Sequence, residues 1–166
     1  MNQDLPRSLK IATLWLLLIL ALFLAFQAWQ RERQAAHFTA AGGIVELRRA
    51  ADGHYHWPGT VNGRATDFLV DTGATTSAIP MALASELALP QLGSMRSSTA
   101  GGVVDGRIVV AELALQGGPR VERMRLAALP SLQSPLLGMD VLGRLRLQQQ
   151  GGVLRIDMSA LAAERR

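Results

Sequence analysis

Hydrophobic and polar residues follow two different patterns along this chain of 166 residues. Near the amino terminus, residues 11–26 form one unbroken apolar run without a charged side chain. From Ile44 onward the apolar runs are short, recur about every ten residues and are separated by Gly, Pro, Asn and Asp. The first pattern is typical of a membrane helix and the second of a β domain. The chain is therefore predicted to be mainly β, with one or two short helices, preceded by one transmembrane helix.

Two dipeptides in the β part predict tight hairpins. Asn62-Gly63 separates residues 54–61 from 64–70, and Gly151-Gly152 separates residues 145–150 from 153–158. Asn and Gly tolerate the positive φ angles that two-residue hairpin turns need. Pro80 is placed to open a short helix, where its missing N–H is harmless. The predicted elements are strands at 44–49, 54–61, 64–70, 103–115, 121–128, 145–150 and 153–158, a helix at 81–87 and a helical turn or two at 139–145.

Residues 11–29 come close to the length of about 20 apolar residues that a helix needs to cross a bilayer. Trp15 and Trp29 lie near the two ends, where interfacial aromatic residues often sit. A cleaved signal peptide is the alternative, but the run is longer than a usual signal core and lacks a small-x-small cleavage site. We therefore expect an uncleaved signal anchor at 11–29, between a tail at 1–10 and a linker at 30–41. The flanking charges do not decide its orientation.

The composition excludes several kinds of site. The chain has no cysteine, which excludes disulfides, thiolate metal sites and cysteine nucleophiles. Its 17 basic and 13 acidic residues are scattered, whereas nucleic-acid binding would need a clustered basic face with interleaved aromatic residues. His54 and His56 could share one strand face, but two imidazoles without a third ligand nearby are usually a surface pair. We expect no metal, no cofactor and no nucleic-acid partner.

The most informative stretch runs from Phe68 to Ile79, where an apolar strand leads directly into Asp71. Thr72 and Gly73 follow, and small and hydroxyl residues then lead into a second apolar strand. Asp-Thr-Gly by itself is common in ordinary turns. A carboxylate at the end of a buried strand is costly to ionise without stabilising partners, so this position is a candidate for chemistry.

Two segments resemble the signatures of the retropepsin-like aspartic proteases. Residues 69–74, Leu-Val-Asp-Thr-Gly-Ala, fit the first motif of that family, and residues 136–142, Leu-Leu-Gly-Met-Asp-Val-Leu, are similar to the second. Residues 53–55, 61–63 and 98–101 further resemble a bacterial, membrane-anchored branch. The resemblance implies an acid-protease half-barrel, placed at residues 42–158 with a tail at 159–166. It also implies a single-pass protein of the bacterial inner membrane whose carboxyl-terminal domain is periplasmic.

The resemblance assigns roles to individual residues. Asp71 would activate water, Thr72 would hydrogen-bond across a dimer axis, and Gly73 would supply an N–H to the carboxylates. Many viral members carry a bracing arginine after the glycine of the second motif. This chain has Met139 there, so the brace is absent or comes from elsewhere. The implied site residues are Asp71, Thr72 and Gly73 for catalysis, Ala74, Thr99, Ala100, Gly101 and Gly102 for substrate binding in the cleft and a closing hairpin, and Leu137, Gly138 and Asp140 for structural support.

Hydrolysis of a peptide bond needs a second carboxylate, because one cannot serve as both acid and base. The chain has a single Asp-Thr-Gly and is too short for two lobes, so the second Asp71 must come from an identical chain on a two-fold axis. We therefore expect a homodimeric aspartic endopeptidase acting on a peptide or protein substrate. The alternative is a catalytically weak retropepsin-like module that dimerises or binds peptides in the cell envelope. Asp140 is the competing acid, but at the start of a short helix it also benefits from the helix dipole.

Overall fold

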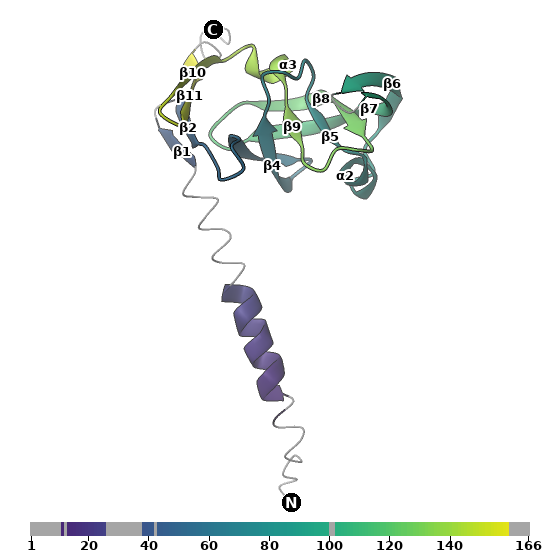
Figure 1. The fold of residues 1–166 in the computed structure, drawn as a ribbon. Helices are drawn as coiled ribbons and strands as arrows, with labels where there is room; N and C mark the ends of the chain where they lie inside the picture. The colour runs from purple at the N-terminus through teal and green to yellow at the C-terminus, as the bar shows by residue number, and fades with distance from the viewer. Residues whose placement is uncertain (1–10, 12, 26–37, 42, 100–101, 160–166) are drawn as a thin grey trace, which may run out of the picture. The chain divides into compact units, whose positions relative to one another are not determined.

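A computed structural model of the chain describes residues 11, 13–25, 38–41, 43–99 and 102–159 (Figure 1). The chain divides into two compact units, residues 1–36 and 37–166. In the first unit, residues 11 and 13–25 are helical and their side chains are exposed. Within the described part of the chain, no helix has both the length and the apolar character that crossing a membrane requires. Residues 12 and 26–29 of the predicted anchor lie outside the described residues.

The second unit is mainly β, which confirms that part of the predicted fold class. Its elements in chain order are β1 (Phe38–Ala41), β2 (Ile44–Arg48), β3 (His56–Val61), β4 (Arg64–Val70), β5 (Ala78–Pro80), α2 (Met81–Glu86), β6 (Gln91–Thr99), β7 (Gly102–Leu115), β8 (Arg120–Leu129), β9 (Leu136–Leu137), α3 (Met139–Leu142), β10 (Arg146–Gln150) and β11 (Val153–Asp157). They form a four-stranded sheet in the order β1-β2-β11-β10 and a seven-stranded sheet in the order β3-β4-β9-β5-β8-β7-β6. Strand β3 also pairs with β7, so the larger sheet curls back on itself.

The tight hairpins form where the sequence predicts them. Asn62 and Gly63 have φ angles of 47° and 80° in the turn between β3 and β4, and Gly151 and Gly152 have 57° and 77° in the turn between β10 and β11. Two consecutive positive φ angles match the right-handed twist of the flanking strands, and few residues other than Asn and Gly adopt them. The first hairpin therefore has a fixed register, which places Trp57 opposite the equally buried Phe68.

Two strands differ from the sequence-based predictions. Strand β1 lies inside the segment predicted as a linker at 30–41, because residues 38–41 pair antiparallel with β2. The folded part therefore begins before residue 42, while residues 30–37 lie outside the described residues. Strand β6 was not predicted, because residues 91–99 are mostly small and polar, and pairing with β7 holds them in extended form. The helical turn or two predicted within 139–145 is the single turn of α3, which ends at Leu142.

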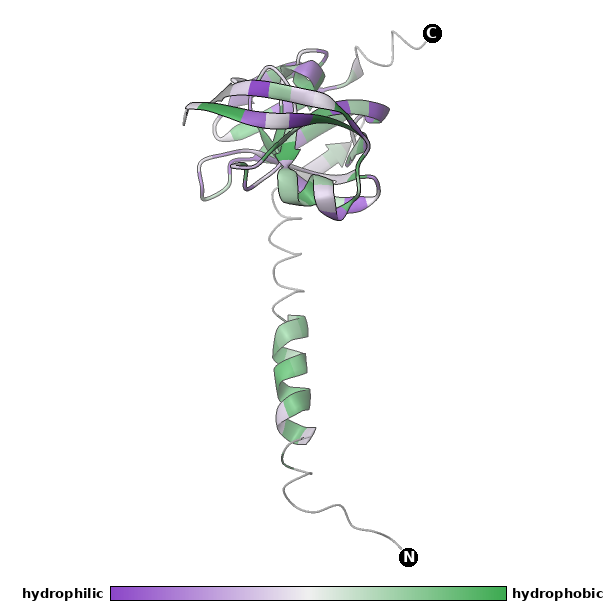
Figure 2. Cartoon of the chain, turned by 90° about the vertical axis from the view of Figure 1, so that its right-hand side faces the viewer, coloured by the Kyte–Doolittle hydropathy of each residue, from purple (hydrophilic) through white to green (hydrophobic). Residues whose placement is uncertain are grey.

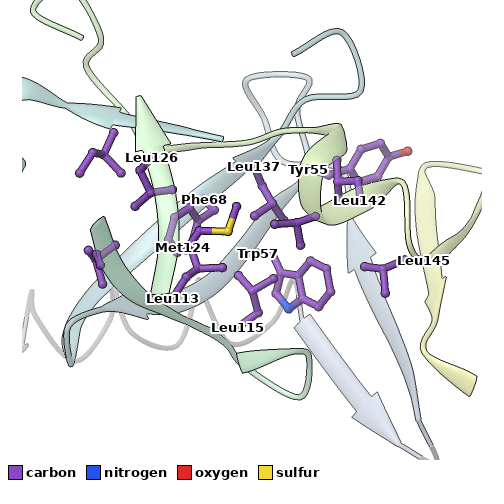
Figure 3. Close-up of a cluster of buried hydrophobic side chains, with 14 of the residues drawn as sticks. Tyr55, Trp57, Phe68, Leu113, Leu115, Met124, Leu126, Leu137, Leu142 and Leu145 are labelled. Atoms are coloured by element: carbon purple, nitrogen blue, oxygen red, sulfur yellow. The ribbon is translucent and has the colours of Figure 1, made fainter. Parts of the chain in front are cut away.

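The core is one large cluster of buried apolar side chains, drawn in Figure 3. Members from β3, β4, β7 and β9 lie within it, among them Trp57, Phe68, Leu113 and Leu137, each 0% exposed. The indole Nε1–H of Trp57 donates a hydrogen bond to the backbone oxygen of Gln116 at 2.9 Å. A buried indole needs such an acceptor, so this bond fixes the position of the largest side chain in the core.

Trp57→Phe should lower the free energy of unfolding by about 1–3 kcal/mol, because it removes the Nε1–H donor and leaves the Gln116 oxygen without its partner. Urea denaturation of the purified chain measures the change. Gln116→Ala is the matched control, because the acceptor is the backbone oxygen and the Gln116 side chain is exposed. Equal losses in the two variants would contradict this account.

Candidate active site

The order of the strands brings the two predicted signatures side by side. Strand β9 pairs parallel with β4, placing Leu69 opposite Leu136 and Val70 opposite Leu137. On its other side β9 pairs antiparallel with β5. Because parallel strands end at the same edge of a sheet, Asp71 after β4 and Gly138 after β9 emerge together. The backbone N–H of Asp71 donates to the oxygen of Leu137 at 3.0 Å, which ties the two strand ends.

The Asp71 carboxylate is held by its own loop. The backbone N–H of Gly73 donates to Asp71 Oδ1 at 2.8 Å, and the N–H of Ala74 donates to the Asp71 carbonyl oxygen at 3.2 Å. A Cβ at Gly73 would lie 3.2 Å from the same Oδ1, so a larger residue would crowd the carboxylate. Among the described residues, Asp71 Oδ2 has no hydrogen-bond partner, and Asp71 is only half-buried. Thr72 beside it is exposed. One carboxylate oxygen is thus fixed while the other remains open.

A second carboxylate, Asp140, binds the two segments together. Asp140 Oδ2 accepts the backbone N–H of Ser77 at 2.8 Å, and Asp140 Oδ1 accepts the Ser77 hydroxyl at 2.6 Å. The Ser77 Oγ in turn accepts the N–H of Gly138 at 3.0 Å. Ser77 is 0% exposed, so its hydroxyl needs these partners. The three residues form a closed set of hydrogen bonds between the start of β5 and the start of α3.

These hydrogen bonds brace the Asp71 loop against the start of α3, a role for which this chain has no arginine at position 139. Met139 is 40% exposed and contributes its backbone, whose N–H donates to the oxygen of Ala74 at 2.8 Å. At Gly138 a Cβ would meet the backbone carbon of Thr76 at 2.7 Å, so the two segments approach too closely for any side chain there. Leu137 is fully buried beneath them. Leu137, Gly138 and Asp140 thus lie together where β9 leads into α3, and their structural support of the site stays a prediction.

The residues predicted to bind substrate lie in two places. Ala74 is half-buried and belongs to the Asp71 loop. Thr99 and Gly102 face each other at the end of the β6–β7 hairpin, where Gly102 has a φ of 111°. Ala100 and Gly101, the predicted tip between them, lie outside the described residues. The predicted closing hairpin thus corresponds to a long β hairpin of the larger sheet.

A small apolar cluster adjoins the strands that carry Asp71. Its buried members are Ala78, Ala127 and Leu129, and the partly buried Met95, Leu132 and Leu136 pack against it. Leu136 lies next to Leu137 on β9, and Met95 comes from the β6–β7 hairpin. This cluster therefore joins the hairpin to the strand end beside Asp71.

Of the two histidines considered as metal ligands, His54 is exposed and His56 is half-buried. His56 lies between two carboxylates, with Nε2 2.7 Å from Asp52 Oδ2 and Nδ1 3.3 Å from Asp67 Oδ2. The other oxygen of Asp67 is buried, and no hydrogen-bond partner for it occurs among the described residues. Burial raises the pKa of Asp67 above its ordinary value. The arrangement is a cluster of one imidazole and two carboxylates, formed by the β3–β4 hairpin and the turn before β3.

The sequence did not single out Ser77 as part of the site. Its partner Asp140 lies 63 positions further along the chain, so no local spacing links them. The one available signal is a polar residue at the start of an otherwise apolar strand. Such a residue is buried only with a partner.

A family model described as aspartyl protease matches residues 57–141, about half of the chain. This span includes the Asp71 loop, the Ser77 contact and the start of α3. The chain belongs to the aspartyl protease family. No curated protein matches the sequence.

Solved structures show which form of the family fold the chain adopts. The crystal structure of a retropepsin-like aspartic protease from Rickettsia conorii superposes with a TM-score of 0.55 and 22% identity, covering 71% of this chain and 93% of that one. EIAV protease in complex with an inhibitor superposes with a TM-score of 0.45 and 23% identity, covering 52% of this chain and 86% of the viral chain. The first likeness shows a retropepsin-like fold, as the sequence motifs indicated.

Ser77→Ala should lower the free energy of unfolding by about 1–3 kcal/mol, because it leaves Asp140 Oδ1 and the Gly138 N–H without their common partner. Asp140→Ala should cost at least as much, since it removes both acceptors of Ser77. Urea denaturation checks both changes. Glu122→Ala is the control, because Glu122 is exposed and forms no ion pair within the described part of the chain. A loss in Asp140→Ala no larger than in Glu122→Ala would refute the bracing role.

The raised pKa of Asp67 predicts a pH dependence of stability. The folded chain binds a proton at Asp67 more tightly than the unfolded chain, so this contribution to stability declines as pH rises above about 4 toward the raised pKa. Urea denaturation at a series of pH values measures the free energy of unfolding of the unmodified chain and of Asp67→Asn. The difference, unmodified chain minus variant, should fall as pH rises from about 4 toward the raised pKa.

Asp157 provides a control of opposite sign. The backbone N–H of Ser159 donates to Asp157 Oδ1 at 2.8 Å and lowers the pKa of that carboxyl. Its contribution is present above about pH 4 and is lost as pH falls through the lowered pKa. The difference between the unmodified chain and Asp157→Asn should accordingly grow with pH. The same slope in both variants would argue against these assignments.

Proposed function

We propose that the chain is an aspartic endopeptidase that hydrolyses peptide bonds with a pair of Asp71 carboxylates from two identical chains. The proposal depends on how the Asp71 carboxylate is held in a retropepsin-like aspartyl protease domain. One of its oxygens is held by Gly73 and the other has no described partner. A carboxylate kept rigid and open at a strand end is suited to act on water.

The proposed dimer follows from the chemistry of the pair. Two neighbouring carboxylates cannot both ionise easily, so they share one proton. The ionised carboxylate takes a proton from a bound water as the water oxygen attacks the peptide carbonyl carbon. The protonated carboxylate donates its proton to the carbonyl oxygen, and the leaving nitrogen is protonated when the intermediate collapses. Each chain supplies one such loop, so the site is complete only in the dimer.

Surface positions support this assembly. Thr72 and Gly73 are exposed in the single chain, although they adjoin a buried strand end. On a two-fold axis Thr72 can hydrogen-bond to its counterpart and hold the two loops together. The extended substrate would pair with the main chain of the cleft and of the β6–β7 hairpin.

We further propose that residues 11–29 anchor the protein in the bacterial inner membrane, with the protease domain in the periplasm. The support is the uncharged run at 11–26 and the two flanking tryptophans. Confinement to a membrane raises the effective concentration of the chains and so promotes the proposed dimer.

Asp71→Asn should reduce cleavage of an unfolded protein by at least about 10³-fold, because it removes the shared proton and the base. The assay uses the purified full chain in mild detergent from pH 3 to 7, with and without a statine-type transition-state analogue. Glu122→Gln should cleave normally, because its side chain is exposed and remote in sequence from the Asp71 loop.

The oligomeric state of each sample decides between the endopeptidase and the alternative of a retropepsin-like binding module. For the endopeptidase, specific activity should rise with chain concentration as dimers form. A confirmed dimer that cleaves nothing and ignores the inhibitor would overturn the endopeptidase and favour the binding module.

A further inference from the structure

Two adjoining hollows lie between α2 and the β6–β7 hairpin. Figure 2 turns this side of the fold, the right-hand side of Figure 1, toward the viewer. The larger has a volume of about 640 Å³, and the smaller of about 210 Å³. Met81 and Arg107 line both, so the hollows form one groove, called here the α2 groove. Among the described residues, its lining contains none of those predicted for the active site.

The two hollows differ in chemistry. The larger is polar, with Ser94, Arg96, Asp105 and Arg107 in its lining. The lining of the smaller includes four apolar residues, Ala84, Ala88, Leu89 and Val109, beside Ser85, Gln91 and Arg107. A ligand that fits both must therefore carry a polar and an apolar group close together.

The polar hollow has an excess of positive charge. Arg96 Nε lies 3.1 Å from Asp105 Oδ1, so these two charges offset one another. Arg107 is exposed and forms no ion pair with any residue that the structure describes. A guanidinium presents two parallel N–H donors that match a carboxylate. The charge and geometry favour an acidic side chain in this hollow.

The backbone beside the groove also has an unused side. Strand β6 is the last strand of the larger sheet and pairs only with β7. Its pairing shifts between Gln91 and Gly93, and Leu92 at this irregularity is 56% exposed. An edge strand offers N–H and C=O groups to an extended peptide, whose alternate side chains then enter neighbouring pockets.

We propose that the α2 groove binds an extended acidic segment of a protein partner, with a carboxylate on Arg107 and a neighbouring apolar side chain in the smaller hollow. Main-chain pairing with β6 would fix the direction of the segment. The binding itself does not depend on peptidase activity. The groove would recruit proteins for cleavage, and this part of the proposal rests on the proposed function.

The test is a binding titration with the full chain in mild detergent, carrying Asp71→Asn so that no probe is consumed. The probe, called the Leu-Glu probe, is a fluorescein-labelled peptide of three Leu-Ser-Glu-Ser repeats, in which Leu and Glu alternate along one face of the extended chain. Its binding is followed by anisotropy. We expect saturable binding that weakens about tenfold or more in Arg107→Gln. Arg123→Gln is the matched control, because Arg123 is also exposed and unpaired among the described residues but lies on β8. The Arg123→Gln variant should bind the Leu-Glu probe normally. A Leu-Gln probe, in which Gln replaces each Glu, should bind the chain with an unmodified groove about as weakly as Arg107→Gln binds the Leu-Glu probe.

A second variant tests the apolar hollow without changing a charge. Ser85 is exposed and lines the smaller hollow, so Ser85→Trp fills it while circular dichroism verifies the fold. We expect this variant also to weaken binding. Unchanged affinity in Arg107→Gln, an equal loss in Arg123→Gln, or no saturable binding to the folded chain would each overturn the proposal. Because cleavage is not measured, none of these outcomes reflects on the Asp71 pair.

Discussion

The arrangement of the candidate site depends on the contact between Asp140 and Ser77. A buried hydroxyl is costly unless it is hydrogen-bonded, and Ser77 is fully buried at the point where the Asp71 loop enters β5. Asp140 satisfies both its N–H and its hydroxyl, and the N–H of Gly138 satisfies the remaining acceptor. The oxygen of Leu137, at the end of β9, holds the start of the Asp71 loop. Gly138 and Asp140, which follow β9, hold the end of that loop at Ser77. Loss of the contact would leave polar groups of three residues unpaired.

The same contact separates the roles of two acids that lie at neighbouring strand ends. Both oxygens of Asp140 are occupied by Ser77, so they are not available to bind water or substrate. Asp71 has one oxygen fixed by Gly73 and one open. Their environments therefore distinguish a structural carboxylate from a chemical one. This explains how a single chain can carry Asp71 and Asp140 close together while the proposed dyad uses only Asp71 from each chain.

The features that the sequence predicted are those set by short-range chemistry. The Asn62-Gly63 turn defines its hairpin locally, and the apolar approach to Asp71 marks a strand end without reference to the rest of the chain. Strands β1 and β6 were missed because neighbouring strands, and not their own side chains, hold them extended. Ser77 was missed for the same reason, since its role comes from a residue 63 positions away. Sequence reasoning was thus weakest where pairing between distant segments decides the structure.

The β6–β7 hairpin takes part in both the α2 groove and the apolar cluster beside Asp71. Gly106 lies under Leu129, where a Cβ would come within 2.7 Å of the leucine side chain, so this face packs on the apolar cluster beside Asp71. Gly106 and Arg107 both line the α2 groove, as does Met95 of the same apolar cluster. An occupant of the groove would therefore contact the same hairpin that packs beside the strand end carrying Asp71.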